Sequence, residues 1–217
     1  MEFKLIIFDC DGVLVDSVAI ERDTLIIMAT ELGVLINNDR DITQFQGGSI
    51  KETVAFIETK LGHAVPDDFI PDFRQRSYAA YDRDLQLIPG VEQMLDEISL
   101  PYCVATSGPV EKIRRNLATT GLLSKFEGKI FSCYDIQRWK PNPDIFLYAA
   151  KGMGVEPERC LVVEDSALGI KAGLAAGMTV LGYPGTESVA ALEMIGATVF
   201  QHMHELPALV ETISSYG

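Results

Sequence analysis

The chain has 217 residues, of which 47% are hydrophobic and 23% are charged, as in an ordinary globular protein. Its formal net charge of −13 argues against nucleic acid and anionic membranes as partners, because both attract clustered Lys and Arg. No apolar run reaches the roughly 18 residues of a membrane span, and the first residues do not have the pattern of a signal peptide. We therefore expect a cytoplasmic protein with no membrane partner.

The first predicted element is a strand over residues 3–8, FKLIIF, whose almost unbroken apolar run is typical of a strand buried on both faces. Two carboxylates, Asp9 and Asp11, follow where this strand ends, and Gly12 breaks the run. An ionised Asp in such a place is costly unless a positive group meets it. This cost indicates a functional site.

The next stretch, about 17–87, does not alternate between strands and helices. Three segments in it have the pattern of amphipathic helices separated by Pro and Gly: IERDTLIIMATELG, SIKETVAFIETKLG and DFIPDFRQRSYAAYDRDL. We interpret residues 17–87 as a small all-helical cap domain inserted after the first strand, between the core segments 1–16 and 88–217.

Strands and helices alternate along the rest of the chain. Strand-like runs are expected at 102–107, 129–133, 160–165, 179–183 and 198–201, with helical patterns of 10–15 residues between them. Such alternation predicts an α/β fold in which a doubly wound parallel sheet is built from right-handed crossovers.

The cysteines and histidines give no indication of a redox or metal site. Cys10, Cys103, Cys133 and Cys160 lie far apart without a C-x-x-C pair, and we interpret them as small buried residues in a reducing cytosol. The His202-Met203-His204 sequence lacks a third metal ligand nearby, so a solvated surface is the expected setting for both histidines.

Functional side chains gather at the predicted strand ends, where ligands bind in open α/β sheets. The strand at 102–107 ends in Thr106 and Ser107 before a helix N-terminus, which favours an anion. Glu164 and Asp165 end the strand at 160–165. Lys140 lies in the RWKPNPD segment, between this strand and the one at 102–107.

Converging carboxylates, an anion-binding turn and a lysine indicate phosphate chemistry with a hard cation. The acids would repel one another without a divalent ion, and oxygen ligands suit Mg²⁺. An ionised Asp9 can attack phosphorus, while Asp11 can protonate the leaving oxygen and then activate water. The order of these weak motifs along successive strand ends gives the hypothesis its strength.

These motifs resemble those of the haloacid dehalogenase-like phosphatase superfamily over essentially the whole chain. DCDGVLVDS is similar to its first motif, ATSG to its second, the lysine of RWKPNPDIF to its third and VVEDSALGIKAGLAAG to its fourth. The resemblance implies a Rossmann-like core and a phosphoaspartate at Asp9. It further implies that Thr106 and Lys140 bind the phosphoryl group, and that Asp9, the Asp11 carbonyl and Asp165 hold Mg²⁺ with Glu164 nearby.

The helical insertion is similar to the cap of the β-phosphoglucomutase-like branch, and YDIQRWKPNPDIF resembles members that hydrolyse 6-phosphogluconate and related sugar phosphates. Two positions depart from the mutases. Glu21 stands where they carry a gating His, and Ile50, followed by Lys51, stands where they carry a phosphate-binding Arg. Both departures favour hydrolysis.

We therefore expect a Mg²⁺-dependent phosphatase of a small phosphorylated metabolite, such as a sugar phosphate or a phosphorylated sugar acid, acting as a monomer. A sugar phosphomutase is the first alternative. The second is a receiver-like signalling domain, which also phosphorylates an Asp but is far shorter and needs no cap.

Overall fold

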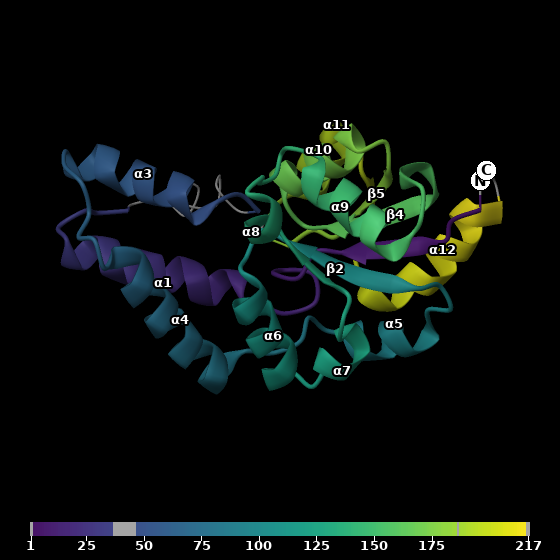
Figure 1. Ribbon diagram of the computed structural model, residues 1–217, viewed down its shortest axis with the longest axis horizontal. Helices are drawn as coiled ribbons and strands as arrows, with labels where there is room; N and C mark the ends of the chain where they lie inside the picture. The colour runs from purple at the N-terminus through teal and green to yellow at the C-terminus, as the bar shows by residue number, and fades with distance from the viewer. Residues whose placement is uncertain (1, 37–46, 186, 216–217) are drawn as a thin grey trace.

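The computed structural model describes residues 2–36, 47–185 and 187–215. Within them, one six-stranded parallel sheet has the strand order β3-β2-β1-β4-β5-β6 and carries helices on both faces (Figure 1). The strands are β1 (Leu5–Phe8), β2 (Tyr102–Thr106), β3 (Ile130–Ser132), β4 (Cys160–Glu164), β5 (Thr179–Gly182) and β6 (Thr198–Val199). The predicted doubly wound parallel fold is confirmed.

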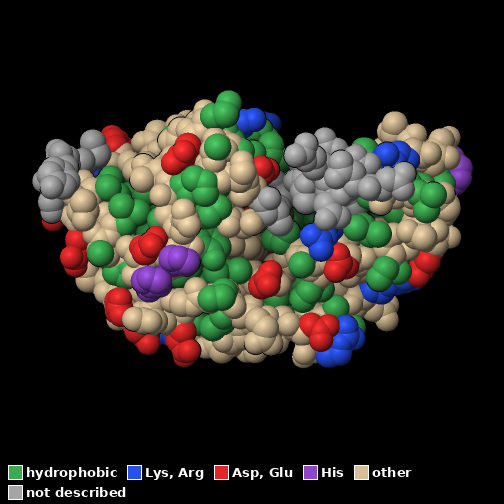
Figure 2. All heavy atoms as spheres, turned by 180° about the vertical axis from the view of Figure 1, so that it is seen from behind, with side chains coloured by type: hydrophobic (Ala, Val, Ile, Leu, Met, Phe, Trp, Pro, Cys, Tyr) green, Lys and Arg blue, Asp and Glu red, His purple; other side chains and the backbone are tan. Residues whose placement is uncertain are grey.

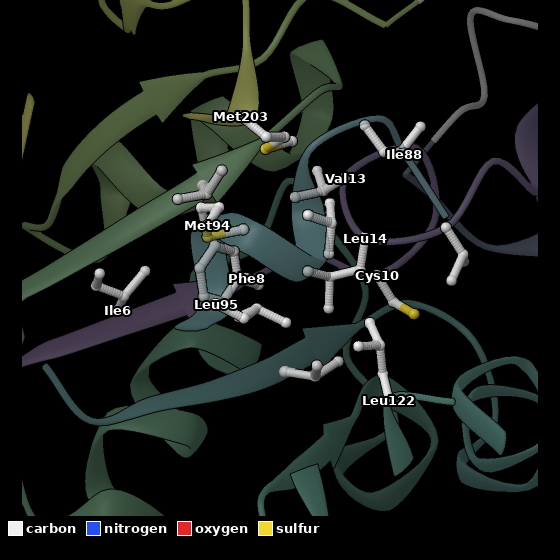
Figure 3. Close-up of a cluster of buried hydrophobic side chains, with 14 of the residues drawn as sticks. Ile6, Phe8, Cys10, Val13, Leu14, Ile88, Met94, Leu95, Leu122 and Met203 are labelled. Atoms are coloured by element: carbon white, nitrogen blue, oxygen red, sulfur yellow. The ribbon is translucent and has the colours of Figure 1, made fainter. Parts of the chain in front are cut away.

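Alternate residues of the central strand enter two different hydrophobic cores. Ile6 and Phe8 of β1 join one core, which Figure 3 shows in close-up with Met94, Leu95 and Met203 around them. That face is covered by α5 (Val91–Glu97), α6 (Val110–Thr119), α7 (Leu123–Phe126) and α12 (Leu206–Ser215). The period of two follows from the pleat of a strand, in which neighbouring side chains point to opposite faces.

Leu5 and Ile7 of β1 belong to the second core, on the other face. This face is covered by α9 (Asp144–Met153), α10 (Ala167–Ala175) and α11 (Val189–Ile195), which lie above the sheet in Figure 1. Because both faces are buried, β1 lacks polar alternation and reads as a continuous apolar run.

Three further helices lie to one side of the sheet (Figure 1): α1 (Val18–Glu31), α3 (Ile50–Leu61) and α4 (Phe69–Asp84). They share a hydrophobic cluster of their own, formed by Leu25, Met28, Ala29, Val34, Val54, Ile57, Phe69 and Phe73. The three helices predicted in this stretch are thus present, and we call them the helical insertion. The domain limits at 17 and 87 stay predictions, and residues 37–46 lie outside the described part of the chain.

The remaining short elements are α8 (Cys133–Ile136) and two 3-10 turns, Pro157–Arg159 and Met203–Glu205. All four cysteines are buried and free, whereas His202 and His204 are exposed and stack on each other. On the face seen in Figure 2, Lys and Arg side chains lie apart or beside acidic ones, so the described residues of this face form no continuous basic surface. Among the described helices, none is long and apolar enough to cross a membrane.

Candidate active site

Three carboxylates meet at the carboxyl edge of the sheet. Because β4 pairs with β1, the residues after both strands come together, and oxygens of Asp9, Glu164 and Asp165 lie within 4.8 Å of one another. Gly12 makes this approach possible: its φ is +82°, and a Cβ there would stand 2.0 Å from Asp165 Oδ2. The turn after β1 therefore requires glycine for both its conformation and its space.

Lys140 is the positive group that the sequence led us to expect beside these acids. Its ammonium group is buried, donates to Asp9 Oδ1 at 2.7 Å, and also pairs with Glu164 Oε1. Burial would lower the pKa of Lys140, but Asp9 and Glu164 outweigh it and raise the pKa above its ordinary value. Lys140 therefore remains charged.

Glu164 organises the start of α10. Its Oε2 accepts hydrogen bonds at 3.0 Å from the Asp165 N–H, the Ser166 N–H and the Ser166 hydroxyl. The Ser166 hydroxyl in turn caps the helix by accepting from the Gly169 N–H. Since Lys140 takes the other oxygen of Glu164, both oxygens of this side chain already have partners.

The turn after β2 carries the predicted anion-binding residues. Thr106 is fully buried, and its Oγ1 accepts from the Gly108 N–H at 3.0 Å. Ser107 instead faces the helical insertion, since its hydroxyl donates to the Gly47 carbonyl at 2.5 Å. The two hydroxyls, adjacent in sequence, thus have different partners.

Asp11 belongs to a second cluster of polar side chains, which includes residues of the helical insertion. Ser17 donates to Asp11 Oδ1 at 2.5 Å, and Lys112 donates to Oδ2 at 2.8 Å. Lys112 also lies 2.5 Å from Glu21 Oε1, which accepts the Tyr81 hydroxyl. Burial would lower the pKa of Lys112, but Asp11 and Glu21 raise it well above its ordinary value.

Sequence reasoning missed Lys112. One signal was available: Lys112 is the third residue of α6, and the positive end of the helix dipole disfavours a cation in the first turn. A buried lysine in that position needs carboxylate partners, and Asp11 and Glu21 supply them.

Burial dominates the electrostatics of the acids. It raises the pKa of Asp9 to about 7, with Glu164 and Asp11 adding to the rise and Lys140 opposing it. Burial likewise raises the pKa of Asp165 well above its ordinary value, again assisted by Glu164 and Asp9. Burial thus favours the protonated forms of both carboxyls, whereas a bound cation would favour their ionised forms.

The acidic cluster fits a hard divalent cation. Its donors are carboxylate oxygens alone, which suit Mg²⁺ better than softer metals. The close packing of Asp165 against Gly12 holds one donor near the chain that carries Asp9 and Asp11.

A pocket of about 150 Å³ lies between this edge of the sheet and the helical insertion. Asp9, Asp11 and Lys112 line it from the core, together with Ser107 and Gly108 of the turn after β2. From the insertion, its walls include Glu21, Ile50, Thr53, Arg74, Ser77 and Tyr81. Thr106 and Lys140 are not on its surface and lie buried beneath it.

These features define an α/β enzyme with an acidic, oxygen-lined site at the carboxyl edge of a parallel sheet. The chain belongs to the haloacid dehalogenase-like hydrolase family, whose model matches residues 3–177. The family that we recognised from the four motifs is thereby confirmed, and its identification excludes the receiver-like alternative.

Known relatives cover nearly the whole chain. The 6-phosphogluconate phosphatase of Escherichia coli (strain K12) is 32% identical over 207 residues, which are 95% of this chain and 94% of that protein. A haloacid dehalogenase-like protein of unknown function from Agrobacterium tumefaciens is 33% identical with a TM-score of 0.84, and the match covers 98% of this chain and 99% of that one.

A family hydrolase from Deinococcus radiodurans, solved with bound phosphate and sodium, is 30% identical with a TM-score of 0.76; the match covers 98% of this chain and 97% of that one. The prediction of a phosphoric monoester hydrolase is confirmed by the family and by the phosphatase among these relatives.

Proposed function

We propose that the chain is a Mg²⁺-dependent phosphatase that hydrolyses a small phosphorylated metabolite through an aspartyl-phosphate intermediate. The observation that carries the proposal is the contact of Asp9 with Lys140 beside Glu164 and Asp165, at the end of a pocket. A carboxylate so placed can attack phosphorus, and a neighbouring ammonium group offsets the charge of the transferred group.

The proposed reaction has two steps. In the first, an oxygen of Asp9 forms a bond to phosphorus while the bond from phosphorus to the substrate oxygen breaks, and Asp11 gives that oxygen a proton. In the second, Asp11 takes a proton from water, whose oxygen attacks phosphorus and releases phosphate from Asp9. Thr106 and Ser107, in the turn before α6, and Lys140, beside Asp9, bind the phosphoryl oxygens through hydrogen-bond donors.

Mg²⁺ would be held by Asp9, Asp165 and the backbone carbonyl of Asp11. When bound, it neutralises negative charge on the phosphoryl oxygens and on the carboxylates. Glu164 lies nearby, but because both of its oxygens already have partners, we assign it to holding Lys140 and the start of α10.

The proposed substrate is a sugar phosphate or a phosphorylated sugar acid such as 6-phosphogluconate. The similarity to the 6-phosphogluconate phosphatase supports this class, since it extends over both the core and the helical insertion. We propose that residues 17–87 act as a cap over the pocket, which is lined from both sides. A monomeric state and a cytoplasmic location stay predictions, and light scattering tests the first.

A sugar phosphomutase is the second candidate. Against it, Glu21 binds Lys112 and Tyr81 at the position of the mutases' gating His, and Ile50 lines the pocket at the position of their phosphate-binding Arg.

The test of the nucleophile is Asp9→Asn, because an amide of nearly the same shape does not attack phosphorus. Turnover of a phosphorylated sugar acid, followed as free phosphate in Mg²⁺, should fall at least about a hundredfold. Circular dichroism should show an unchanged fold. A well-folded variant that retains more activity than this would overturn the covalent mechanism.

A further inference from the structure

Helix α4 presents one polar face to the pocket. Arg74, Ser77 and Tyr81 follow one another at spacings of three and four residues, which places them on the same side of the helix, and all three line the pocket. The hydroxyl of Tyr81 already donates a hydrogen bond to Glu21 Oε1. The other two residues, Arg74 and Ser77, have no role in the proposed chemistry.

Ser77 is a buried hydroxyl without a partner. Its residue is 1% exposed, and its Oγ makes no hydrogen bond within the described part of the chain. A serine inside a helix can satisfy its hydroxyl on the carbonyl four residues earlier, and Ser77 does not do so. Because an unpaired buried hydroxyl is unfavourable and Ser77 lies on the pocket wall, its hydroxyl is available to a ligand in the pocket.

Arg74 is held in place without being neutralised. Its Nη2 donates to the Tyr134 hydroxyl at 2.9 Å, and its guanidinium group lies 5.5 Å from the centre of the Tyr134 ring. Among the described residues, no carboxylate forms an ion pair with it. Arg76, two residues on, contrasts with it: it pairs with Glu31 and Asp72 outside the pocket.

Unlike Arg74, the two lysines of the site already form ion pairs with carboxylates. Lys140 bonds to Asp9 and Glu164, and Lys112 to Asp11 and Glu21. A guanidinium group fixed by an aromatic ring, with several N–H donors directed by its planar geometry, is suited to a carboxylate or a phosphate. The similarity to a 6-phosphogluconate phosphatase favours the carboxylate.

We propose that Arg74 and Ser77 form a subsite for the end of the substrate away from its phosphoryl group, and that this end carries a carboxylate. Arg74 binds the carboxylate, and Ser77 bonds to it or to a neighbouring hydroxyl. This inference rests on the proposed phosphatase function and narrows its substrate to phosphorylated sugar acids.

The test compares a phosphorylated sugar acid with the aldose phosphate of the same length, which lacks the carboxylate. Arg74→Gln should raise the KM for the sugar acid roughly ten- to a hundredfold and should change the KM for the aldose phosphate less than about threefold. Arg74→Lys should recover part of the loss. Arg76→Gln is the matched control on the same helix and should leave both KM values unchanged.

Ser77→Ala separates a binding role from a packing role. If the Ser77 hydroxyl forms its hydrogen bond only with bound substrate, the variant should be at least as stable as the native protein, because an unpaired polar group is removed. Its KM for the sugar acid should rise a few-fold. An unchanged KM would assign Ser77 to packing alone and would overturn its place in the subsite.

Three outcomes would overturn the carboxylate assignment: equal KM changes for both substrates in Arg74→Gln, a native preference for the aldose phosphate, or a native preference for a sugar bisphosphate. Hydrolysis of p-nitrophenyl phosphate tests the phosphatase chemistry without a carboxylate. If no ester is hydrolysed, the proposed function fails, and calorimetry with the phosphorylated sugar acid in chelator still decides the subsite. Weaker binding to Arg74→Gln supports it, and equal binding overturns it.

Discussion

Lys112 connects the two parts of the pocket through a single ammonium group. It comes from the core helix α6, whereas Asp11 follows β1 and Glu21 comes from α1 of the helical insertion. The lysine side chain is 9% exposed, so its charge lies mostly out of water. Removing one member of such a pair leaves the other charges without compensation.

Lys112→Met should therefore destabilise the protein by about 1–3 kcal/mol, because Asp11 and Glu21 would face each other without the cation. Urea denaturation of Lys112→Met, Glu21→Gln and the double variant measures the coupling between the two residues. The double variant should lose less than the sum of the single losses. Lys125→Met, which removes an exposed ion pair with Asp96, is the control and should leave stability almost unchanged.

Strict additivity in this cycle would contradict the coupling. It would mean that solvent, and not Lys112, compensates Glu21.

Asp9 links metal binding to pH. Burial raises the pKa of this carboxyl to about 7 in the metal-free protein, and the cation needs the ionised form. Below that pKa a proton competes with the ion, so the apparent Mg²⁺ affinity should fall about tenfold for each pH unit below 7 and level off above it. Asp165, whose pKa is also raised, makes the fall steeper.

Calorimetric titration with Mg²⁺ between about pH 5.5 and pH 8.5 checks this dependence. The Asp9→Asn variant is the control, since its amide does not titrate and its pH dependence should be shallower. The same steep fall in the variant would assign the competing proton to another group.

At the scale of elements, the apolar runs predicted all six strands. The runs are clearest in β1 and β4, which are buried throughout, whereas the edge strands β3 and β6 are partly exposed. The buried setting of β1 explains why Asp9, directly after it, stood out as a costly charge. Short helices such as α7 and α8, each of four residues, have too few turns to show a helical period, and the sequence did not predict them. Lys112 was missed because its partners lie 91 and 101 positions away in the chain, and tertiary structure alone brings them together.

Gly169 of helix α10 lies directly against Glu164 of the site. Alanine favours helices over glycine by about 1 kcal/mol, so Gly169→Ala would stabilise an isolated α10. In the protein, a Cβ at Gly169 would stand 1.9 Å from Glu164 Oε1, and Glu164 is fixed by Lys140 and Ser166. We therefore expect the reverse sign, a loss of about 1–3 kcal/mol in urea denaturation, with a lower kcat as Lys140 is displaced.

The control in the same helix is Ala175→Gly, at an exposed position. It should lower stability through helix propensity while leaving kcat unchanged. A stabilised Gly169→Ala with native kcat would show that Glu164 moves aside without cost.

At the scale of the whole molecule, the core and the helical insertion meet through polar contacts around the pocket and through Tyr81 of α4, which packs into the hydrophobic core of the sheet. Ser107 donates to Gly47 on one side, and Lys112 pairs with Glu21 on another. If the insertion moves away from the sheet to admit a substrate, these contacts break together with the ion pair of Arg115 and Asp82. Residues of the insertion line the same pocket as Asp9 and Asp11, where they would decide the fate of the proposed phosphoaspartate.

We expect that fate to be hydrolysis, so β-glucose 1-phosphate should not be converted to the 6-phosphate. A mutase has to shield its phosphoaspartate from water while a sugar bisphosphate turns round, and a strong bidentate donor such as Arg is suited to hold the second phosphate. Ile50, where the resemblance to the mutases places that Arg, lines the pocket with an apolar side chain, and Glu21 adds a carboxylate there. A coupled assay for glucose 6-phosphate, run beside an assay for free phosphate, measures both products, and we expect free phosphate to dominate. Isomer that forms faster than phosphate would instead make the chain a mutase, with Lys51 or Arg74 as the residue that holds the second phosphate.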